Sequence, residues 1–379
     1  MNMNKLKVGT VFSGIGAFEQ ALEILDIPHE IAFACDNGGI LFEDIATAQE
    51  LQQLDKIDSP KDKLEFVEAI YKKAKRKNFV KQSYLANYEL NETDFYHDVR
   101  FMGSHINKEI DIFVGGSPCQ SFSVAGARGG FEDTRGTLFF EFARCIKELQ
   151  PKVFIYENVK GLVGHDTGRT FATVLNTFDE LGYKYFYQIL NAKDYEIPQN
   201  RQRIFIIGFQ NNNLEFKFPE KLKLEYTMGD FLIGQTDTNK TGNTPSFLTN
   251  KRYIKKGYVQ NIEKEVSEKY YLSEKVKKII LATEAKNMKF NPTINTDIAK
   301  TLLASMHKMH RANVDNYVTV DGKIRRLTPR ECLRLMGFPD TFKQVVSDVQ
   351  CYKQAGNSIV VNVLINLLNE ILLTKIFKT

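Results

Sequence analysis

The sequence predicts an α/β protein with a doubly wound, mostly parallel sheet. Between residues 7 and 209, apolar runs rich in β-branched and aromatic residues alternate with segments of helical periodicity. The strand-like runs are KVGTVF (7–12), IAFAC (31–35), IDIFVGG (110–116), KVFIYENV (152–159), YKYFYQIL (183–190) and RIFIIGF (203–209). The helical segments are GAFEQALEIL (16–25), LFFEFARCIKEL (138–149) and FATVLNTFDELG (171–182). Strands that alternate with helices form a parallel sheet covered on both faces.

Only residues 191–202 separate the last two strand-like runs. A connection this short holds no crossover helix, so we expect an antiparallel pair at one edge of the sheet. From residue 211 onward the alternation is lost and polar runs predominate. The sequence therefore predicts a first domain (1–210), an inserted smaller and irregular domain (211–339), and a C-terminal segment (340–379) that returns to the first domain.

The returning segment contains a strongly apolar helical pattern, AGNSIVVNVLINLLNEIL (355–372), with Asn357 or Ser358 expected as its N-cap. Asparagine and glutamate residues interrupt this pattern, so we do not expect it to span a membrane. The N-terminal residues MNMNKLK lack the apolar core of a signal peptide. We therefore expect a cytoplasmic protein.

The number and spacing of the cysteines and the net charge indicate which kinds of site and partner to expect. The chain has five cysteines, and none of them forms a C-x-x-C pair. Neither a disulfide framework nor a metal site is expected. The formal net charge of +5 is compatible with a polyanionic partner without requiring one.

A lysine-rich segment, SPKDKLEFVEAIYKKAKRKNFVK (59–81), overlaps the stretch 37–80. Its apolar residues Leu64, Val67, Tyr71 and Ala74 fall on one helical face. The segment either contacts nucleic-acid phosphates or is a solvated helix packed by its apolar stripe, and the second reading is favoured.

The first strand runs into a glycine-rich turn, TVFSGIGAFE, which opens a helix. Such a turn lets the backbone approach a ligand closely. Glu19 stands where a dinucleotide fingerprint has its third glycine, and a carboxylate there opposes a pyrophosphate. Asp36, at the end of the second strand, is placed to bind both ribose hydroxyls. An adenosine cofactor without phosphates, such as S-adenosylmethionine, fits both observations, although Asp36 is equally compatible with an ordinary loop.

Two further strands deliver reactive side chains to the same sheet edge. IDIFVGG leads into SPCQSFS, which contains Cys119, and KVFIYENV ends in Glu157 and Asn158. A carboxyl after so apolar a run is expected to be desolvated, with a raised pKa that makes it a hydrogen-bond donor. The alternatives are a buried core thiol at Cys119 and a helix cap or surface acid at Glu157.

Six motifs carry a resemblance to a known family. They are FSGIGAFE, GGSPCQSFS, ENV, QNRQR, RRLTPRECLRLMGFP and QAGNS. Together they closely resemble the DNA (cytosine-5) methyltransferases of bacterial restriction-modification systems. The resemblance covers both ends of the chain and its middle, apart from residues 37–80 and the second domain. It implies the methyltransferase fold that binds S-adenosylmethionine, with the second domain reading the DNA target.

The resemblance implies a covalent mechanism. Cys119 is identified as the nucleophile that adds to C6 of cytosine, and Glu157 as the carboxyl that holds N3 and the exocyclic amine. The C5 atom of the adduct then accepts the methyl group, and loss of its proton expels the cysteine. Arg203 is identified as the residue that holds the cytosine carbonyl oxygen, and Arg201 is grouped with it as a catalytic candidate. The target base is expected to flip out of the duplex.

The remaining assignments also follow from the resemblance. The cofactor-binding residues that it implies are Phe12, Gly14, Gly16, Asp36, Asp98, Pro118, Leu138 and Asn357. The DNA-contacting residues are Gln120, Ser123, Arg128, Arg135 and Thr301. Double-stranded DNA is the expected substrate, and a cognate restriction endonuclease is the expected functional partner. We expect a monomer.

Three other functions are weighed against this reading. A tRNA cytosine-5 methyltransferase of a related branch shares the P-C-Q and E-N-V motifs, but the sizeable second domain favours duplex DNA. A catalytically inactive DNA-binding relative is opposed by the presence of Cys119, Glu157 and Arg203. A thiol-dependent NAD enzyme is opposed by Glu19. The sequence does not predict the recognition sequence or the role of residues 37–80.

Overall fold

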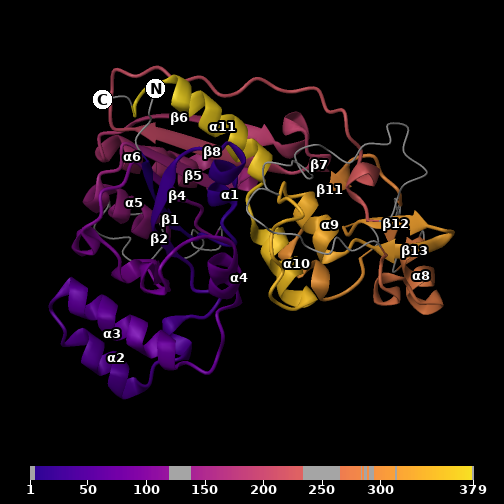
Figure 1. Cartoon of the computed structure of the whole chain (residues 1–379), viewed down its shortest axis with the longest axis horizontal. Helices are drawn as coiled ribbons and strands as arrows, with labels where there is room; N and C mark the ends of the chain where they lie inside the picture. The colour runs from indigo at the N-terminus through magenta and orange to yellow at the C-terminus, as the bar shows by residue number, and fades with distance from the viewer. Residues whose placement is uncertain are drawn as a thin grey trace. The chain divides into compact units, whose positions relative to one another are not determined.

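The computed structural model describes residues 5–118, 138–233, 265–282, 284–285, 288–289, 294–311 and 314–377 (Figure 1). The chain divides into two compact units. Unit 1 comprises residues 1–190, 202–219 and 367–379, and unit 2 comprises residues 191–201 and 220–366.

Unit 1 is built on a seven-stranded sheet with the order β3-β2-β1-β4-β5-β8-β6. The strands are β1 (Leu6–Val11), β2 (His29–Cys35), β3 (Phe95–Tyr96), β4 (Ile112–Gly115), β5 (Val153–Val159), β6 (Lys184–Asn191) and β8 (Gln202–Phe209). The pairs β2–β3, β1–β2, β1–β4 and β4–β5 are parallel, whereas β5 and β8 are antiparallel. The predicted doubly wound sheet is confirmed, and β6 is its edge strand beside β8.

Three helices of unit 1 match the predicted helical segments: α1 (Ala17–Ile24), α5 (Leu138–Leu149) and α6 (Arg169–Glu180). A fourth helix, α11 (Val361–Leu373), lies in the returning segment, and its residues from 367 onward belong to unit 1. Figure 1 shows α5 and α6 together on one side of the strands. There Phe139 and Phe142 of α5 and Phe178 of α6 pack on strand residues in one buried cluster. Aromatic side chains bury large apolar areas, so these three residues contribute strongly to that layer.

Three more helices occupy the stretch between β2 and β3. They are α2 (Ala48–Asp55), α3 (Pro60–Lys73) and α4 (Phe79–Asn87). Ser59 caps α3 through its side chain, and Pro60 stands at the first position of the helix. Leu64, Val67 and Tyr71 are buried. The apolar stripe predicted from the sequence is therefore packed, and the helix ends at Lys73, one residue before Ala74.

Short 3-10 segments connect the longer elements. They are η1 (Phe42–Asp44), η2 (Glu92–Asp94), η3 (Val99–Phe101), η4 (Ser104–Ile106), η6 (Lys160–Gly168), η7 (Ala192–Tyr195), η8 (Met228–Phe231), η10 (Glu268–Tyr270) and η11 (Ala304–His307).

Unit 2 contains short strands and small helices. Its strand pairs are β7 (Gln199–Asn200) with β11 (Ala299–Lys300), β9 (Glu284–Ala285) with β10 (Met288–Lys289), and β12 (Tyr317–Val320) with β13 (Lys323–Arg326). Its helices are α8 (Glu274–Leu281), α9 (Pro329–Arg334) and α10 (Asp348–Asn357). Asp321 and Gly322, both with positive φ, form the two-residue turn between β12 and β13.

A fully buried ion pair holds together the segment RRLTPRE (325–331) of unit 2. The guanidinium of Arg325 donates to both carboxylate oxygens of Glu331, at 2.8 and 2.7 Å, and both side chains are 0% exposed. The same carboxylate accepts from the backbone N–H of Thr328 and of Ile233. These four donors satisfy the buried charge, and they tie β13, α9 and residue 233 together.

The end of the chain differs from the prediction. Residues 355–357 are the last turn of α10, Ser358 is extended, and α11 begins only at Val361. The prediction of Asn357 or Ser358 as an N-cap was therefore wrong. The stretch Asp348–Leu373 is long and apolar enough to cross a membrane by length and composition, but 56% of its most apolar window is buried inside the protein.

We expect Glu331→Ala to lower the free energy of unfolding by about 3–5 kcal/mol, because it leaves the buried guanidinium of Arg325 without its carboxylate. Urea unfolding followed by circular dichroism measures this. Lys323→Ala, which removes an exposed pair with Glu268 from the same hairpin, is the control and should cost less than about 1 kcal/mol. Equal losses in the two variants would contradict the assignment.

Candidate active site

The glycine-rich turn after β1 adopts a conformation that few residues tolerate. Phe12, Gly14 and Gly16 have φ values of 53°, 54° and 78°. Positive φ at Phe12 is strained, as is common at ligand sites. A Cβ at Gly16 would lie 2.2 Å from the ring of Tyr88, so only glycine fits there. No atom lies within 4 Å of a Cβ placed on Gly14, which leaves the turn open on that side.

Asp36 joins the glycine-rich turn to the end of β2. Its carboxylate accepts from the backbone N–H of Gly14 at 2.9 Å and from that of Gly38 at 2.8 Å. Burial raises the pKa of Asp36, and the two N–H donors oppose this shift. An oriented carboxylate beside an open glycine turn suits a ribose with two hydroxyls. The residues present thus fit an adenosyl cofactor.

Glu19 lies behind the turn. Its Oε1 accepts from the hydroxyls of Thr10 at 2.9 Å and Tyr84 at 2.6 Å, and the residue is 1% exposed. Burial raises the pKa of Glu19. The hydroxyl of Tyr88 donates to the carbonyl of Gly16 at 2.6 Å. Glu19 therefore supports the turn from inside the protein and does not face a ligand, which differs from the expectation that it would oppose a pyrophosphate directly.

Asp98 is buried between its neighbours in the chain. It caps η3 by accepting from the backbone N–H of Arg100, and it is 6% exposed. The Arg100 guanidinium donates to the same carboxylate through Nε at 2.9 Å and through a terminal nitrogen at 2.5 Å. Asp98 follows β3, the strand next to β2, so both carboxylates of the predicted cofactor site stand at the same end of the sheet.

The other predicted cofactor residues lie at the carboxyl end of β4 and in unit 2. Pro118 is exposed, three residues after β4, and Leu138 is the first residue of α5, where it packs against the core. Asn357 is the last residue of α10 in unit 2, and it is exposed.

Strands β4 and β5 bring the two predicted catalytic segments together. Gly115 pairs with Tyr156 in the parallel register. Asn158 donates its side-chain amide to the carbonyl of Ser117 at 2.9 Å, and the hydroxyls of Ser117 and Tyr156 are 2.8 Å apart. A Cβ on Gly116 would lie 2.9 Å from Oε2 of Glu157. The carboxyl of Glu157 therefore stands directly beside the segment that leads to Cys119.

Glu157 forms an ion pair with Arg203. Arg203 Nε lies 3.0 Å from Glu157 Oε1, and the two side chains are 17% and 13% exposed. The antiparallel register of β5 and β8 pairs Val159 with Arg203, so residues 157 and 203 lie diagonally on one face of the sheet. The two residues that the sequence assigned to the target base are thus in contact.

Arg201 is placed differently. Its guanidinium donates to the carbonyls of Leu302, Gly356 and Ser358 at 2.8–2.9 Å, and the residue is 3% exposed. All four residues belong to unit 2. Arg201 thereby fixes the backbone on both sides of Asn357.

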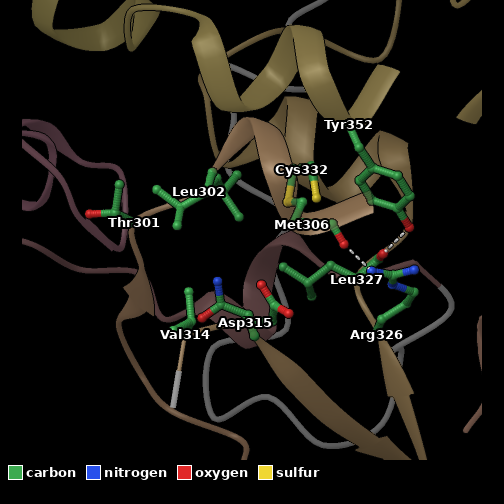
Figure 2. Close-up of a pocket in the computed structure, with 11 residues that line it drawn as sticks. Thr301, Leu302, Met306, Val314, Asp315, Arg326, Leu327, Cys332 and Tyr352 are labelled. Atoms are coloured by element: carbon green, nitrogen blue, oxygen red, sulfur yellow. Dashed lines mark hydrogen bonds between the residues drawn. The ribbon is translucent and has the colours of Figure 1, made fainter. Parts of the chain in front are cut away.

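Thr301 donates its hydroxyl to the carbonyl of Asn200 at 2.6 Å, which extends the β7–β11 pairing. It also lines a small cavity of about 20 Å³ in unit 2, together with Asp315, Arg326 and Tyr352 (Figure 2). Figure 2 shows Tyr352 donating to Leu327 and Arg326 donating to Met306 at one side of this cavity. The volume suits a single water molecule and excludes a base or a cofactor.

Five predicted site residues lie outside the described residues: Cys119, Gln120, Ser123, Arg128 and Arg135. The four cysteines that the structure describes are all buried. Burial raises the pKa of Cys145 to about 12 and that of Cys351 to about 11, and it raises the pKa of Cys35 and Cys332 as well. A nucleophilic thiol needs the opposite shift. Within the described ranges, no group of three or more metal-binding side chains occurs.

A family model for C-5 cytosine-specific DNA methylases matches residues 62–373. The chain belongs to this family. It is 37% identical over 311 residues to the type II methyltransferase M.SsoII of Shigella sonnei, a match that covers 78% of this chain and 72% of that protein. It is 40% identical over 259 residues to the type II methyltransferase M.HhaI of Haemophilus parahaemolyticus, covering 67% of this chain and 73% of that protein.

Solved structures support the fold of this cytosine-5 methyltransferase. The S. pombe Dnmt2 methyltransferase matches with a TM-score of 0.62 and 16% identity, over 98% of both chains. A putative DNA modification methyltransferase encoded within a prophage of E. coli matches with a TM-score of 0.59 and 20% identity, over 97% of this chain and 99% of that one. At sequence identities this low, the two matches show that the fold is shared and nothing more.

The sequence left three supporting residues of the methyltransferase site unassigned. Asn158 was noted beside Glu157, but its bond to Ser117 depends on the pairing of β4 with β5. Tyr84 and Tyr88 lie on or just after α4, more than 60 residues from the turn that they support. Only Asn158 had a signal in the sequence, namely its position in the E-N-V motif.

We expect Glu19→Gln to stabilise the protein increasingly as the pH rises. The pKa of Glu19 is raised above its ordinary value of 4.5 in the folded protein, so the folded state binds more protons than the unfolded state between the two values. The free energy of unfolding therefore falls as the pH rises through that window. Glutamine keeps the shape of the side chain and cannot ionise. Urea unfolding of both proteins between about pH 4 and about pH 8 measures the difference, and a pH-independent difference would contradict the assignment.

We expect one thiol of the native protein to react rapidly with a thiol-specific reagent such as 5,5′-dithiobis(2-nitrobenzoic acid). The four described thiols are buried with raised pKa values, which suppress the reactive thiolate. The fast phase should be lost in Cys119→Ala, and all remaining thiols should react after unfolding in guanidinium. Rapid reaction of two or more thiols in the native protein would show that this burial is wrong.

Proposed function

The chain is a DNA (cytosine-5) methyltransferase, and we propose how its own residues carry out the reaction. In this proposal Cys119 adds to C6 of a flipped cytosine in duplex DNA, while Glu157 and Arg203 hold the base. The methyl group comes from S-adenosylmethionine, which supplies an electrophilic methyl on its sulfonium when bound. The observation that carries the proposal is the contact between Glu157 and Arg203 beside the segment that leads to Cys119.

The paired side chains complement one edge of cytosine. A guanidinium donates to the carbonyl oxygen, and a protonated carboxyl donates to N3 and accepts from the exocyclic amine. Arg203 already stands against the carboxyl of Glu157, so the two groups can meet one edge of the same base. The carboxyl must carry a proton to donate to N3.

Protonation or strong hydrogen bonding at N3 makes C6 electrophilic enough for a thiolate. The new S–C6 bond places electron density on C5, which takes up the methyl group, and loss of the C5 proton then breaks the S–C6 bond. Asn158 serves this step by fixing the carbonyl of Ser117, two residues before Cys119. Gln120, Ser123, Arg128 and Arg135, which follow the cysteine, are proposed DNA contacts.

Cofactor binding is proposed at the carboxyl ends of β1, β2 and β3. Asp36 would bind the ribose, Asp98 the adenine amine, and Phe12, Gly14 and Gly16 the adjacent backbone surface. Pro118, Leu138 and Asn357 complete the set. The support is the carboxylate of Asp36 held by two backbone N–H donors beside the open side of Gly14.

Arg201 is proposed to act indirectly, by holding Gly356 and Ser358 on either side of Asn357. The irregular domain, residues 211–339, is proposed to read the target sequence, with Thr301 supporting the backbone of the extruded nucleotide. Residues 340–379 return to the catalytic domain, residues 1–210. The cellular setting that we propose is the cytoplasm of a bacterium, where the enzyme acts as a monomer and protects DNA from a restriction endonuclease of the same specificity.

The experiment that tests this function follows labelled methyl from S-adenosylmethionine into unmethylated duplex DNA of mixed sequence, with conversion sequencing of the product. We expect label on C5 of cytosine within one short sequence. Glu157→Gln and Cys119→Ala should each lower the turnover number by about 10³-fold or more, since each removes a group that acts directly on the base. Glu180→Gln, an exposed carboxylate at the end of α6, is the control and should retain full activity.

Two outcomes would contradict the proposal. Label on tRNA with none on DNA would make the chain a tRNA methyltransferase of the same family. Binding of duplex DNA and S-adenosylmethionine without any label would make it an inactive DNA-binding relative.

A further inference from the structure

The stretch between β2 and α4 leaves the sheet and returns to it at one point. Asn78 donates its side-chain amide to the carbonyl of Asp36 at 2.7 Å, and it caps α4 by accepting from Val80 and Lys81. A Cβ on Gly38 would lie 2.2 Å from Oδ1 of Asn78. Residues 38–77, which we term the excursion, therefore begin and end against the residue assigned to the ribose.

The excursion has a hydrophobic core of its own. Ile40, Phe42, Val67, Ile70 and Tyr71 form a buried cluster, and Phe101 packs against it. The rings of Phe42 and Phe101 are 6.0 Å apart between centroids. Phe101 is the last residue of η3, the segment that Asp98 caps. The excursion is thus packed against the end of η3, three residues after Asp98.

Glu68 of α3 binds His97, the residue before Asp98. One carboxylate oxygen accepts from the backbone N–H of His97 at 2.7 Å, and the other lies 2.7 Å from its Nδ1. The imidazole is stacked on the ring of Tyr71, with centroids 4.6 Å apart and an interplanar angle of 10°. His97 is therefore fixed in position by two polar bonds and one stacked face, all from the excursion.

Glu43 of η1 forms an ion pair with Arg100, which is also paired with Asp98. Its carboxylate accepts from Arg100 at 2.5 Å, while the same guanidinium donates to both oxygens of Asp98. The hydrogen bond to Asp98 is the main cause of the raised pKa of Arg100, so the guanidinium keeps its charge throughout. Arg100 thus links Glu43 of the excursion to the buried carboxylate.

We propose that the excursion is a positioning element for the adenine end of the cofactor site, with Glu68 as its principal positioning residue. The inference rests on the proposed cofactor role of Asp98. The excursion contacts His97 directly before Asp98 and Arg100 and Phe101 after it, which restricts the backbone on both sides of that residue. It makes these contacts through carboxylates, so the direction of the Asp98 side chain depends on hydrogen bonds that substitution can remove one at a time.

The carboxylates of Glu68 and Glu43 differ in how far they are exposed to solvent. The Glu68 and His97 side chains are 23% and 8% exposed, whereas Glu43 and Arg100 are 51% and 35% exposed. Solvent screens the second pair, and exposed ion pairs contribute little. The bond from Glu68 to a backbone N–H also fixes the main chain directly. Glu68 is therefore expected to matter more than Glu43.

The test measures the affinity for S-adenosylmethionine by calorimetry, the turnover number at saturating cofactor and the stability in urea, all on the full-length protein. Glu68→Ala should weaken cofactor binding about tenfold, because it removes an acceptor from a buried donor, with the turnover number unchanged. Glu68→Gln, which retains an acceptor for the N–H of His97, should weaken binding by less than about threefold. The matched control is Glu65→Ala, one turn earlier on α3, whose exposed carboxylate lies 3.8 Å from Lys61, and it should bind as the unaltered protein does.

A double-mutant cycle with Asp98→Asn separates positioning from general stability. If Glu68 acts through Asp98, Glu68→Ala should add less than about twofold to the weakening caused by Asp98→Asn, because coupled residues are not additive. Additive effects would overturn the proposal, as would an unchanged affinity of Glu68→Ala accompanied only by lower stability. If Glu68→Ala does not fold, Glu68→Asp carries the same test, since its shorter side chain draws the carboxylate away from His97.

Failure of the proposed function is distinguishable. If the unaltered protein does not bind S-adenosylmethionine, the cofactor assignment and the positioning role both fall. If Asp98→Asn binds as well as the unaltered protein, the adenine role of Asp98 falls and the positioning role falls with it. If Asp98→Asn weakens binding and Glu68→Ala does not, the cofactor assignment stands and only the positioning role is overturned.

Discussion

The antiparallel register of β5 with β8 is the constraint on which the proposed catalytic site depends. It pairs Val159 with Arg203 and thereby sets the guanidinium of Arg203 3.0 Å from the carboxylate of Glu157. The pairs β2–β3, β1–β2, β1–β4 and β4–β5 of the same sheet are parallel. A shift of one residue would turn Arg203 to the opposite face of the sheet and separate the pair. The inversion of a single strand therefore brings together two residues that lie 46 positions apart in the sequence.

The parallel strands of the sheet position the other proposed site residues. Strands that run in the same direction end at one edge, so Gly14, Asp36 and Asp98 follow β1, β2 and β3, while Ser117 and Glu157 stand at the ends of β4 and β5. Ligands of open α/β sheets bind at this edge, where the strand order reverses. Here the reversal lies between β1 and β4. The proposed cofactor residues Gly14, Asp36 and Asp98 accordingly fall on one side of that point, and the proposed catalytic residue Glu157 falls on the other.

Local patterns in the sequence predicted much of this arrangement. Alternating apolar runs and helical segments predicted the strands β1, β2, β4, β5, β6 and β8 and the helices α1, α5 and α6, and the apolar stripe of 59–81 predicted the packed face of α3. The two-residue strand β3 and the helices α2 and α4 were not predicted. Such local patterns did not predict the contacts between segments that are distant in the sequence. The bonds of Asn78 to Asp36 and of Tyr88 to Gly16 cross 42 and 72 positions, and nothing local to either residue indicates them. The break between α10 and α11 was missed because the apolar pattern continues across the extended residue Ser358.

The charged groups show the same difference between what local patterns predict and what depends on contacts between distant segments. Glu157 was predicted from its position after an apolar strand, whereas its partner depends on tertiary pairing. Arg201 and Arg203 are two residues apart in one motif, yet Arg201 holds three backbone carbonyls and Arg203 meets Glu157. The backbone passes from unit 2 to unit 1 between them, at residue 202. Motif spacing alone does not distinguish a residue at the site from one that supports the backbone.

Covalent trapping on duplex DNA that contains 5-fluorocytosine tests the central claim most directly, because the C5 fluorine cannot leave as a proton does. In the presence of S-adenosylmethionine, we predict a complex that survives denaturation and whose peptide map joins the base to Cys119. Cys119→Ala should form no such complex although it still binds DNA. Tight binding of the fluorinated duplex by the unaltered protein without a covalent complex, or attachment at another residue, would contradict catalysis by Cys119 together with the Glu157–Arg203 pair.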